Sequence, residues 1–184
     1  MKFFFIYLVI FFLSLNVQSK TYGIVTGLEI PRYVSLKFNE SNMRKGPSKN
    51  YPIKYKYLII NTPVEIIEEN GHWRKIKDIE NNEGWMNKGL LKGNRYGLIN
   101  IPYNQGAQIY DYPHGNVIGR IKKMNIVKIN KCFGDWCFIQ INKVIRGWVL
   151  KYNLWGIYND ESFNMPFYQP LIEKYWFMLS KLRN

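Results

Sequence analysis

The 184-residue sequence has one alanine, two histidines and two cysteines, and no long apolar run follows Lys20. The scarcity of alanine, beside frequent Ile, Val, Tyr, Phe and Trp, favours strands over helices. Two His and two Cys form a four-ligand zinc site only if all four converge, so we expect no metal or other cofactor. The missing apolar run excludes a helical membrane span in the body of the chain. The 47% apolar content is typical of a globular protein and argues against disorder.

Residues 1–19 have the pattern of a secretory signal peptide. Lys2 gives a positive start, residues 3–15 form an apolar run broken only by Ser14, and Ser19 is a small residue at the expected cleavage position. An uncleaved anchor is the alternative, but the run is shorter than the roughly 20 residues that a spanning helix needs. We therefore expect cleavage between Ser19 and Lys20 and a periplasmic or secreted protein.

The body of the chain repeats itself once. Trp73 recurs as Trp136 and Trp85 as Trp148, both at an offset of 63. Upstream, residues 43–47 correspond to residues 109–113 at an offset of 66, which places a loss of three residues in the loop that follows. The N-terminal pattern and the repeat together predict a signal peptide, two domains and a tail, with boundaries 1–19, 33–93, 94–158 and 159–184.

Each unit has the sequence features of short strands separated by turns. The β-rich runs are 64–67, 73–77 and 83–86 in the first unit, and 126–131, 137–141 and 145–149 in the second. Short strands without helices cannot bury both faces of an open sheet, so we expect each unit to curl into a small barrel that removes its edges. The fold class predicted is all-β, with two tandem barrels.

The tail has a helical pattern. Pro170 suits a helix start, and the apolar residues that follow recur at three- and four-residue spacing. These features predict one short amphipathic helix that packs on its own domain. The stripe consists of Ile172, Tyr175, Trp176, Leu179 and Leu182.

The first unit has a distinctive motif at each end. It opens with Asn42-Met43-Arg44-Lys45-Gly46-Pro47-Ser48, continues with Tyr51-Pro52-Ile53, and closes with Trp73, Gly84-Trp85 and Leu90-Leu91. These motifs resemble those of bacterial SH3-like (SH3b) domains, and the chain is similar to secreted proteins with two tandem SH3-like domains. The second unit departs from the opening motif, with Gln108-Ile109-Tyr110 in place of Asn-x-Arg.

The resemblance implies a shallow binding groove between the loop after the first strand and a neighbouring hairpin. Those segments carry tyrosines beside basic residues, which suits contact with a peptide or a sugar. The recurring tryptophans are interpreted as core and barrel-closure residues. The candidate ligand-binding residues are Arg44, Tyr51, Tyr55, Tyr57, Tyr110 and Tyr112.

Cys132 and Cys137 bracket a four-residue loop between two predicted strands. Residues that face each other across such a hairpin lie about 5.5 Å apart, within reach of a disulfide. An exported chain with two cysteines is expected to pair them, whereas a redox-active pair would favour the C-x-x-C spacing. The equivalent residues of the first unit, Glu69 and Arg74, are expected to form a weak cross-strand ion pair.

Positive charge is unevenly distributed. The chain has 26 Lys+Arg against 13 Asp+Glu, and the net charge is +4 over residues 33–93 and +7 over residues 94–155. Such an excess suits an anionic surface, such as wall polymers, lipid headgroups or an acidic protein. Export argues against nucleic acid as a partner.

The sequence gives little support for an enzyme. His72 and His114 lie in predicted turns and are expected to be solvated rather than catalytic. If the cysteines are paired, no Cys–His pair is available for nucleophilic chemistry. We therefore predict no catalytic residues, and a binding or scaffold protein of the bacterial cell envelope that contacts peptidoglycan or an envelope protein. The alternative is an envelope hydrolase, or its accessory subunit, acting on the cell wall.

Overall fold

The structure is a computed structural model that describes residues 20–102, 106–142, 144–164 and 169–182. The predicted signal peptide and its cleavage site before Lys20 therefore lie outside or at the border of the described residues. Within these residues, no helix is both long and apolar enough to cross a membrane.

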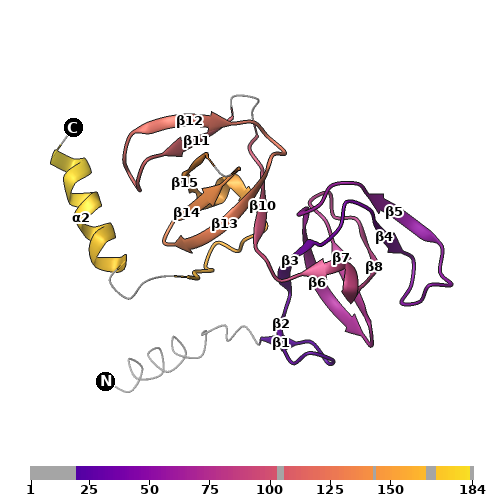
Figure 1. Cartoon of the computed structure of the whole chain (residues 1–184). Coiled ribbons are helices and arrows are strands. Elements are labelled where there is room, and N and C mark those ends of the chain that lie inside the picture. Colours follow the sequence, from indigo (N-terminus) through magenta and orange to yellow (C-terminus); the bar gives the residue numbers. More distant parts are fainter. Residues whose placement is uncertain (1–19, 103–105, 143, 165–168, 183–184) are drawn as a thin grey trace, which may run out of the picture.

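The first unit is a seven-stranded antiparallel sheet, preceded by a two-stranded hairpin (Figure 1). The strand order in the sheet is β5-β4-β8-β7-β6-β3-β9, and the 3₁₀ helix η1 (Lys88–Leu90) joins β8 to β9. The hairpin consists of β1 (Thr21–Tyr22) and β2 (Glu29–Ile30). The sheet strands are β3 (Arg32–Leu36), β4 (Ser41–Arg44), β5 (Ile53–Tyr57), β6 (Pro63–Asn70), β7 (Trp73–Lys77), β8 (Glu83–Asn87) and β9 (Leu91–Lys92).

The second unit repeats this arrangement. Its strand order is β12-β11-β15-β14-β13-β10-β16, so every strand occupies the position of its counterpart in the first unit. The 3₁₀ helix η2 (Lys151–Asn153) again precedes the last strand. The strands are β10 (Tyr96–Ile99), β11 (Ala107–Tyr110), β12 (Val117–Ile121), β13 (Ile126–Phe133), β14 (Trp136–Gln140), β15 (Arg146–Leu150) and β16 (Leu154–Trp155).

The offsets seen in the sequence recur in the strands, with one correction. β7 begins at Trp73 and β14 at Trp136, and β4 ends at Arg44 and β11 at Tyr110, so the offsets of 63 and 66 are as expected. β5 and β12, however, begin at Ile53 and Val117, an offset of 64. The second unit has therefore lost two residues in the loop before β12 and one in the loop after it, rather than three in a single loop.

The all-β prediction is confirmed, but closure of each sheet into a barrel without edges is wrong. β5 and β9 are the two ends of the first sheet, and no pairing joins these described strands. β9 has two residues and follows a 3₁₀ turn, so it offers too few backbone groups to run along β5. The second sheet is open between β12 and β16 in the same way.

Each unit has an inner core on one face of its sheet. Along β8, Gly84 and Met86 are buried, so Trp85 between them points to the opposite face and is half-buried. The inner core of the first unit consists of Leu36, Met43, Val64, Ile66, Ile76 and Met86. The larger core of the second unit includes Ile99, Val127, Ile129, Ile139, Val149 and both cysteines.

All four recurring tryptophans lie outside these inner cores; their interpretation as core residues is confirmed for the second unit and wrong for the first. Trp136 and Trp148 form a separate buried cluster with Phe133, and Trp73 and Trp85 are half-buried. The cause is strand alternation, because the residues on either side of each tryptophan in β8 and β15 point inward.

Cys132 and Cys137 are cross-strand partners and form the predicted disulfide. Their Cα atoms lie 4.1 Å apart, closer than the expected distance. Cys132 exchanges its backbone hydrogen bonds with Phe163, at 3.2 and 3.0 Å, on the other side of β13. The two cysteines therefore face each other as a non-hydrogen-bonded pair, the closer of the two antiparallel arrangements.

Replacing both cysteines by alanine is expected to lower the free energy of unfolding of the second unit by about 2 kcal/mol. The disulfide closes a loop with a sequence separation of 5, which is short, so the unfolded chain loses little entropy by closing it. Urea unfolding of both proteins measures the difference. Non-reducing peptide mapping of the wild type should recover the two cysteines linked, and two alkylated thiols would contradict the pairing.

Glu69 and Arg74 occupy the places of the two cysteines, and their interaction is not the weak cross-strand ion pair that we expected. The Glu69 side chain is fully buried and Arg74 is 5% exposed, with 3.4 Å between Arg74 Nε and Glu69 Oε1. The β1–β2 hairpin covers the pair: Val25 N, Thr26 N and Thr26 Oγ1 donate to Glu69 at 3.0, 2.9 and 2.7 Å. Arg32 Nη2 adds a second ion pair at 2.6 Å.

The Glu69 carboxylate is strongly stabilised in its charged form. Burial alone would raise the pKa of Glu69, but the hydrogen bonds from Arg32, Thr26 and Val25 outweigh it and lower the pKa to about 2. One buried ion cluster therefore fastens the N-terminal hairpin to the sheet.

Contacts between aromatic rings join the two units. The Tyr33 ring lies 5.2 Å from the Trp155 ring and 4.7 Å from the Tyr158 ring. Tyr158 Oη donates to Glu65 Oε1 at 2.7 Å, and Lys77 Nζ lies 2.6 Å from the other oxygen of Glu65. These contacts hold β3 and β6 of the first unit against the end of the second.

The C-terminal segment contains α2 (Gln169–Leu182), which lies beside the second unit (Figure 1). Of the predicted apolar stripe, only Ile172 and Tyr175 have described side chains, and Tyr175 is 56% exposed. The ring of Phe177, which is not on that stripe, lies 5.6 Å from the ring of His114 in the second unit.

Candidate ligand grooves

Two surface grooves lie at equivalent places in the two units. Groove one, about 360 Å³, is bordered by the end of β4, the start of β7 and the segment from the end of β8 through η1. Groove two, about 290 Å³, is bordered by β11, β12 and the segment from the end of β15 through η2. Groove one is lined by Asn42, Arg44, Lys49, Trp73, Asn87, Gly89 and Leu90. Groove two is lined by Ile101, Pro102, Gly106, Ala107, Gln108, Tyr110, Arg120, Leu150, Tyr152 and Asn153.

The repeat relates five lining residues of groove one to five of groove two: Asn42, Arg44, Asn87, Gly89 and Leu90 correspond to Gln108, Tyr110, Leu150, Tyr152 and Asn153. Arg44 corresponds to Tyr110 at the offset of 66, and Gly89 corresponds to Tyr152 at the offset of 63. The duplicated fold therefore builds one groove twice, but its chemistry differs between the units.

Groove one is basic. Arg44 lies on β4, and its Nη1 donates to the carbonyl oxygen of Tyr51 at 2.7 Å, so the following loop positions the guanidinium. The Tyr51 ring packs over Gly46, where a Cβ atom would lie 2.6 Å from the ring. This contact explains why the opening motif needs glycine there. Lys49 adds a second cation, and Trp73 provides an aromatic face.

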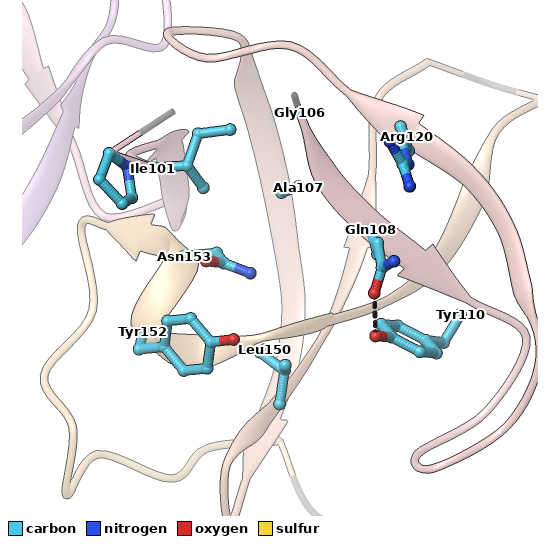
Figure 2. Close-up of a pocket in the computed structure, with 10 residues that line it drawn as sticks. Ile101, Gly106, Ala107, Gln108, Tyr110, Arg120, Leu150, Tyr152 and Asn153 are labelled. Carbon is cyan, nitrogen blue, oxygen red and sulfur yellow. Dashed lines mark hydrogen bonds between the residues drawn. The ribbon is translucent and has the colours of Figure 1, made fainter. Parts of the chain in front are cut away.

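Groove two is aromatic, with one cation from Arg120. Tyr110 Oη donates to Gln108 Oε1, and the Tyr110 ring meets the Trp136 ring edge-on at 5.0 Å. Burial, and to a smaller extent the nearby Tyr152, raise the pKa of Tyr110. Figure 2 shows the phenol groups of Tyr110 and Tyr152 pointing toward each other across the groove, with Leu150 between them. Tyr152 is 70% exposed and accessible to a ligand.

The remaining predicted site residues do not join these grooves. Tyr51 is 46% exposed next to groove one, and Tyr112 packs against the Trp136–Trp148 cluster of the second unit. Tyr55 and Tyr57 line a different cleft, between the two units. The structure thus brings Arg44 and Tyr51 together and separates both from Tyr55 and Tyr57.

Tyr57 is held by the fold. Its hydroxyl donates to Asp78 Oδ2 at 2.9 Å, and its ring packs against the inner core of the first unit. Burial, followed by the charge of Asp78 and this hydrogen bond, raises the pKa of Tyr57. Its phenol therefore serves the packing of β5 rather than a groove.

Sequence reasoning missed several lining residues, among them Lys49, Trp73 and Tyr152. The repeat could have identified Tyr152, because it places this aromatic residue at the position where the first unit has Gly89. Among the described residues, no group of three or more His, Cys, Asp or Glu side chains is placed to hold a metal ion.

Comparisons with known proteins identify the first unit. Residues 37–93 match the family model of the bacterial SH3 domain, so the resemblance seen in the motifs is confirmed there. The match does not extend to the second unit, whose opening motif differs. No curated protein matches the chain.

Two solved structures show distant similarity. NlpC1 from Trichomonas vaginalis is 17% identical, with a TM-score of 0.31, over 72% of this chain and 48% of that chain. NlpC2 from Trichomonas vaginalis is 17% identical, with a TM-score of 0.32, over 73% of this chain and 51% of that chain. The chain thus spans about half the length of either protein.

Proposed function

We propose that this chain, whose first unit matches the bacterial SH3 domain, is an exported, non-catalytic binding protein of the bacterial cell envelope. It contacts peptidoglycan or an envelope protein through grooves one and two. The observation that carries the proposal is the duplication of the groove: two open, equivalent surfaces present cationic and aromatic side chains on rigid strands and 3₁₀ helices.

The chemistry of the grooves suits a polymer that contains both charged and neutral parts. A guanidinium and an ammonium in groove one can pair with carboxylates of a peptide. Phenol rings with amide side chains in groove two suit the apolar faces and hydroxyls of a sugar or a peptide backbone. The net charge of +13 also favours anionic wall material.

The lining of the grooves favours binding over catalysis. Among the described residues that line them, neither groove has an Asp, Glu, His, Cys or Ser side chain. Such groups supply most general acids, general bases and nucleophiles, and the groove side chains that can also take these roles are Lys49, Tyr110 and Tyr152. The grooves are therefore suited to holding a ligand, and the hydrolase alternative gains no support from them.

The combined substitution Arg44→Gln and Tyr152→Ser is expected to weaken retention on purified peptidoglycan about tenfold or more, with little change in melting temperature. Both side chains reach the groove surface, and together they remove one charge-assisted contact and one exposed ring. A co-sedimentation assay at physiological salt measures the effect. Arg146→Gln with Tyr22→Ser is the matched control, because both residues are exposed and outside the grooves.

Equal retention of the groove variant and the wild type would contradict the proposal for peptidoglycan. If peptidoglycan retains neither the wild type nor the groove variant, and one envelope protein binds the wild type but not the variant, that envelope protein is the partner. Release of soluble wall fragments by the wild type would favour the hydrolase alternative.

If the protein is exported, the mature chain is expected to begin at Lys20. Mass spectrometry measures this, and a chain that begins at Met1 would contradict export.

A further inference from the structure

The outer faces of the two sheets, which point away from the inner cores, differ in charge at equivalent positions. Three glutamates of the first unit have cations at the corresponding positions of the second, each at the offset of 63. All six side chains lie on the outer faces, because they or their cross-strand partners alternate with inner-core residues such as Ile76 and Ile139. Glu65, Glu68 and Glu83 correspond to Lys128, Lys131 and Arg146.

In the first unit, lysines on the same face pair with two of these glutamates. Lys77 Nζ lies 2.6 Å from Glu65 Oε2, and Lys75 Nζ lies 3.0 Å from Glu83 Oε2. The second unit lacks both lysines as well as the glutamates, so its outer face keeps the new cations without compensating charges of the opposite sign. The residues at the positions of the two lysines are Phe138 and Gln140.

Lys128 and Arg146 are exposed and have no carboxylate partner in the part of the chain that the structure describes. None of the seven strands of the second sheet contains Asp or Glu. Glu161 lines a polar hollow together with Lys128, but its carboxylate accepts a hydrogen bond from Arg95 Nη2 at 2.9 Å and forms an ion pair with that residue. The acidic residues within 94–155 lie in turns: Asp111 and Asp135.

The two cations lie in one row across three neighbouring strands. Lys128 on β13 pairs with Gln140 on β14, and Gln140 pairs with Arg146 on β15. Adjacent strands lie about 4.8 Å apart, so the backbone positions of the two cations are about 10 Å apart, with an amide side chain between them. This row is the last one before the β14–β15 loop, in which Ile141 N donates to Ile145 O at 3.1 Å.

The β14–β15 loop holds two aliphatic side chains in solvent, directly before Arg146. Val144 is 86% exposed and Ile145 is 45% exposed. Asn142 Oδ1 accepts hydrogen bonds from the backbone N–H groups of both residues at 2.9 Å, so the loop is held in one conformation. The first unit has asparagines at the two equivalent positions. The second unit therefore becomes more apolar in this loop at the place where its outer face becomes cationic.

We propose that this end of the second sheet, which we call the basic tip, binds the surface of an anionic lipid membrane. Its cations contact lipid phosphates, and its aliphatic side chains enter the interface between headgroups and acyl chains. A hydrated polyanion would satisfy the cations but would gain nothing from an aliphatic residue as exposed as Val144. No residue of the basic tip lines groove one or two, so the site is separate from the proposed function. The basic tip consists of Lys128, Gln140, Val144, Ile145 and Arg146.

The probe is vesicles of equal parts phosphatidylglycerol and phosphatidylcholine, mixed with the mature chain (residues 20–184), and co-sedimentation measures the bound fraction. Lys128→Gln with Arg146→Gln is expected to weaken binding about tenfold or more, because each Lys or Arg near an anionic membrane strengthens binding about fivefold. Lys45→Gln with Lys88→Gln is the matched control, since it removes the same charge from two exposed lysines of the first unit. Vesicles of phosphatidylcholine alone are expected to retain little protein.

Val144→Ser separates a membrane from a soluble polyanion. This variant is expected to bind the anionic vesicles about fivefold more weakly or less, because the membrane interface accepts the aliphatic side chain. Its binding to soluble inorganic polyphosphate should equal that of the wild type. Ile24→Ser is the matched control, since Ile24 is 88% exposed in the β1–β2 hairpin of the first unit. All the substituted side chains are exposed, so the melting temperatures should stay close to that of the wild type.

The proposal is overturned if the mature chain does not bind the anionic vesicles, or if the Lys45–Lys88 control weakens binding as much as the Lys128–Arg146 variant. It is also overturned if Val144→Ser binds the vesicles like the wild type, and polyphosphate binding that is lost only in the Lys128–Arg146 variant would then assign the basic tip to a soluble polyanion. Purified peptidoglycan contains no lipid and the vesicles contain no peptidoglycan. Failure of this proposal is therefore distinguishable from failure of the proposed function.

Discussion

Glu69→Gln is expected to cost about 3 kcal/mol or more of the free energy of unfolding of the first unit. The substitution keeps the size of the side chain but removes the charge that Arg32 and Arg74 share. Arg74 would then be a buried cation, 5% exposed, without its carboxylate partner. Breaking a buried ion pair from one side is far more costly than losing an exposed pair.

The same carboxylate predicts how stability depends on pH. The pKa of Glu69 is lowered on folding, from 4.5 to about 2, so the unfolded chain binds its proton more tightly than the folded one. The stabilisation is therefore fully present above about pH 5 and is lost as the pH falls toward 2. The difference in stability between wild type and Glu69→Gln should shrink over this window and stay constant above it.

Urea unfolding between pH 2 and pH 7 measures both effects. Glu68→Gln is the matched control, because Glu68 is the exposed neighbour of Glu69 on β6. Hydrogen exchange adds a local measurement: the amides of Val25 and Thr26, which donate to Glu69, should exchange faster in the Glu69 variant. A cost equal to that of Glu68→Gln, or unchanged exchange at the hairpin, would show that the ion cluster does not fasten it.

The sequence predicts those features that depend on residues close together in the chain or at a fixed spacing. The tryptophan spacing predicted the repeat, and turn residues at Gly71 and Gly134, both with positive φ, marked the hairpins. The disulfide followed because its two cysteines lie at the ends of one such hairpin. In each case, the residues that decide the structure are neighbours in the chain or recur at a fixed offset.

Features that depend on distant segments could not be predicted in the same way. The burial of Glu69 comes from Val25 and Thr26, far upstream in the chain, and nothing near β6 indicates that a hairpin covers it. Tyr57 is predicted for a groove, yet its hydroxyl donates to Asp78, which follows β7, the second strand further along the chain. The pair that was expected to be weak is thus a buried ion pair, and the tyrosine that was expected in a groove is half-buried, both because of long-range contacts.

The face of the sheet on which each tryptophan side chain lies, by contrast, can be predicted from the sequence. In β8, Met86 is an inward residue, so strand alternation places Trp85 outward, and Ile76 does the same for the position of Trp73 in β7. The assumption that large aromatic residues fill a small core outweighed this pattern. As a consequence, the Trp73 ring lies on the outer face of the sheet and forms part of the wall of groove one.

Trp136 and Trp73, which are equivalent in the repeat, are expected to differ in how much they stabilise their units. Trp136→Ala is expected to lower the free energy of unfolding by about 3–5 kcal/mol, and Trp73→Ala by about 1–2 kcal/mol. Trp136 is 4% exposed and packs edge-on against Tyr110 and His114, whereas Trp73 is half-buried at the border of groove one. Because Tyr110 would lose the ring that supports it, Trp136→Ala should also weaken ligand retention through groove two under conditions where the variant is folded. Thermal and urea unfolding of both variants measure the stability difference. Equal losses of unfolding free energy at the two positions would contradict a stabilising role for the buried cluster of Phe133, Trp136 and Trp148. Groove two would then not depend on that cluster.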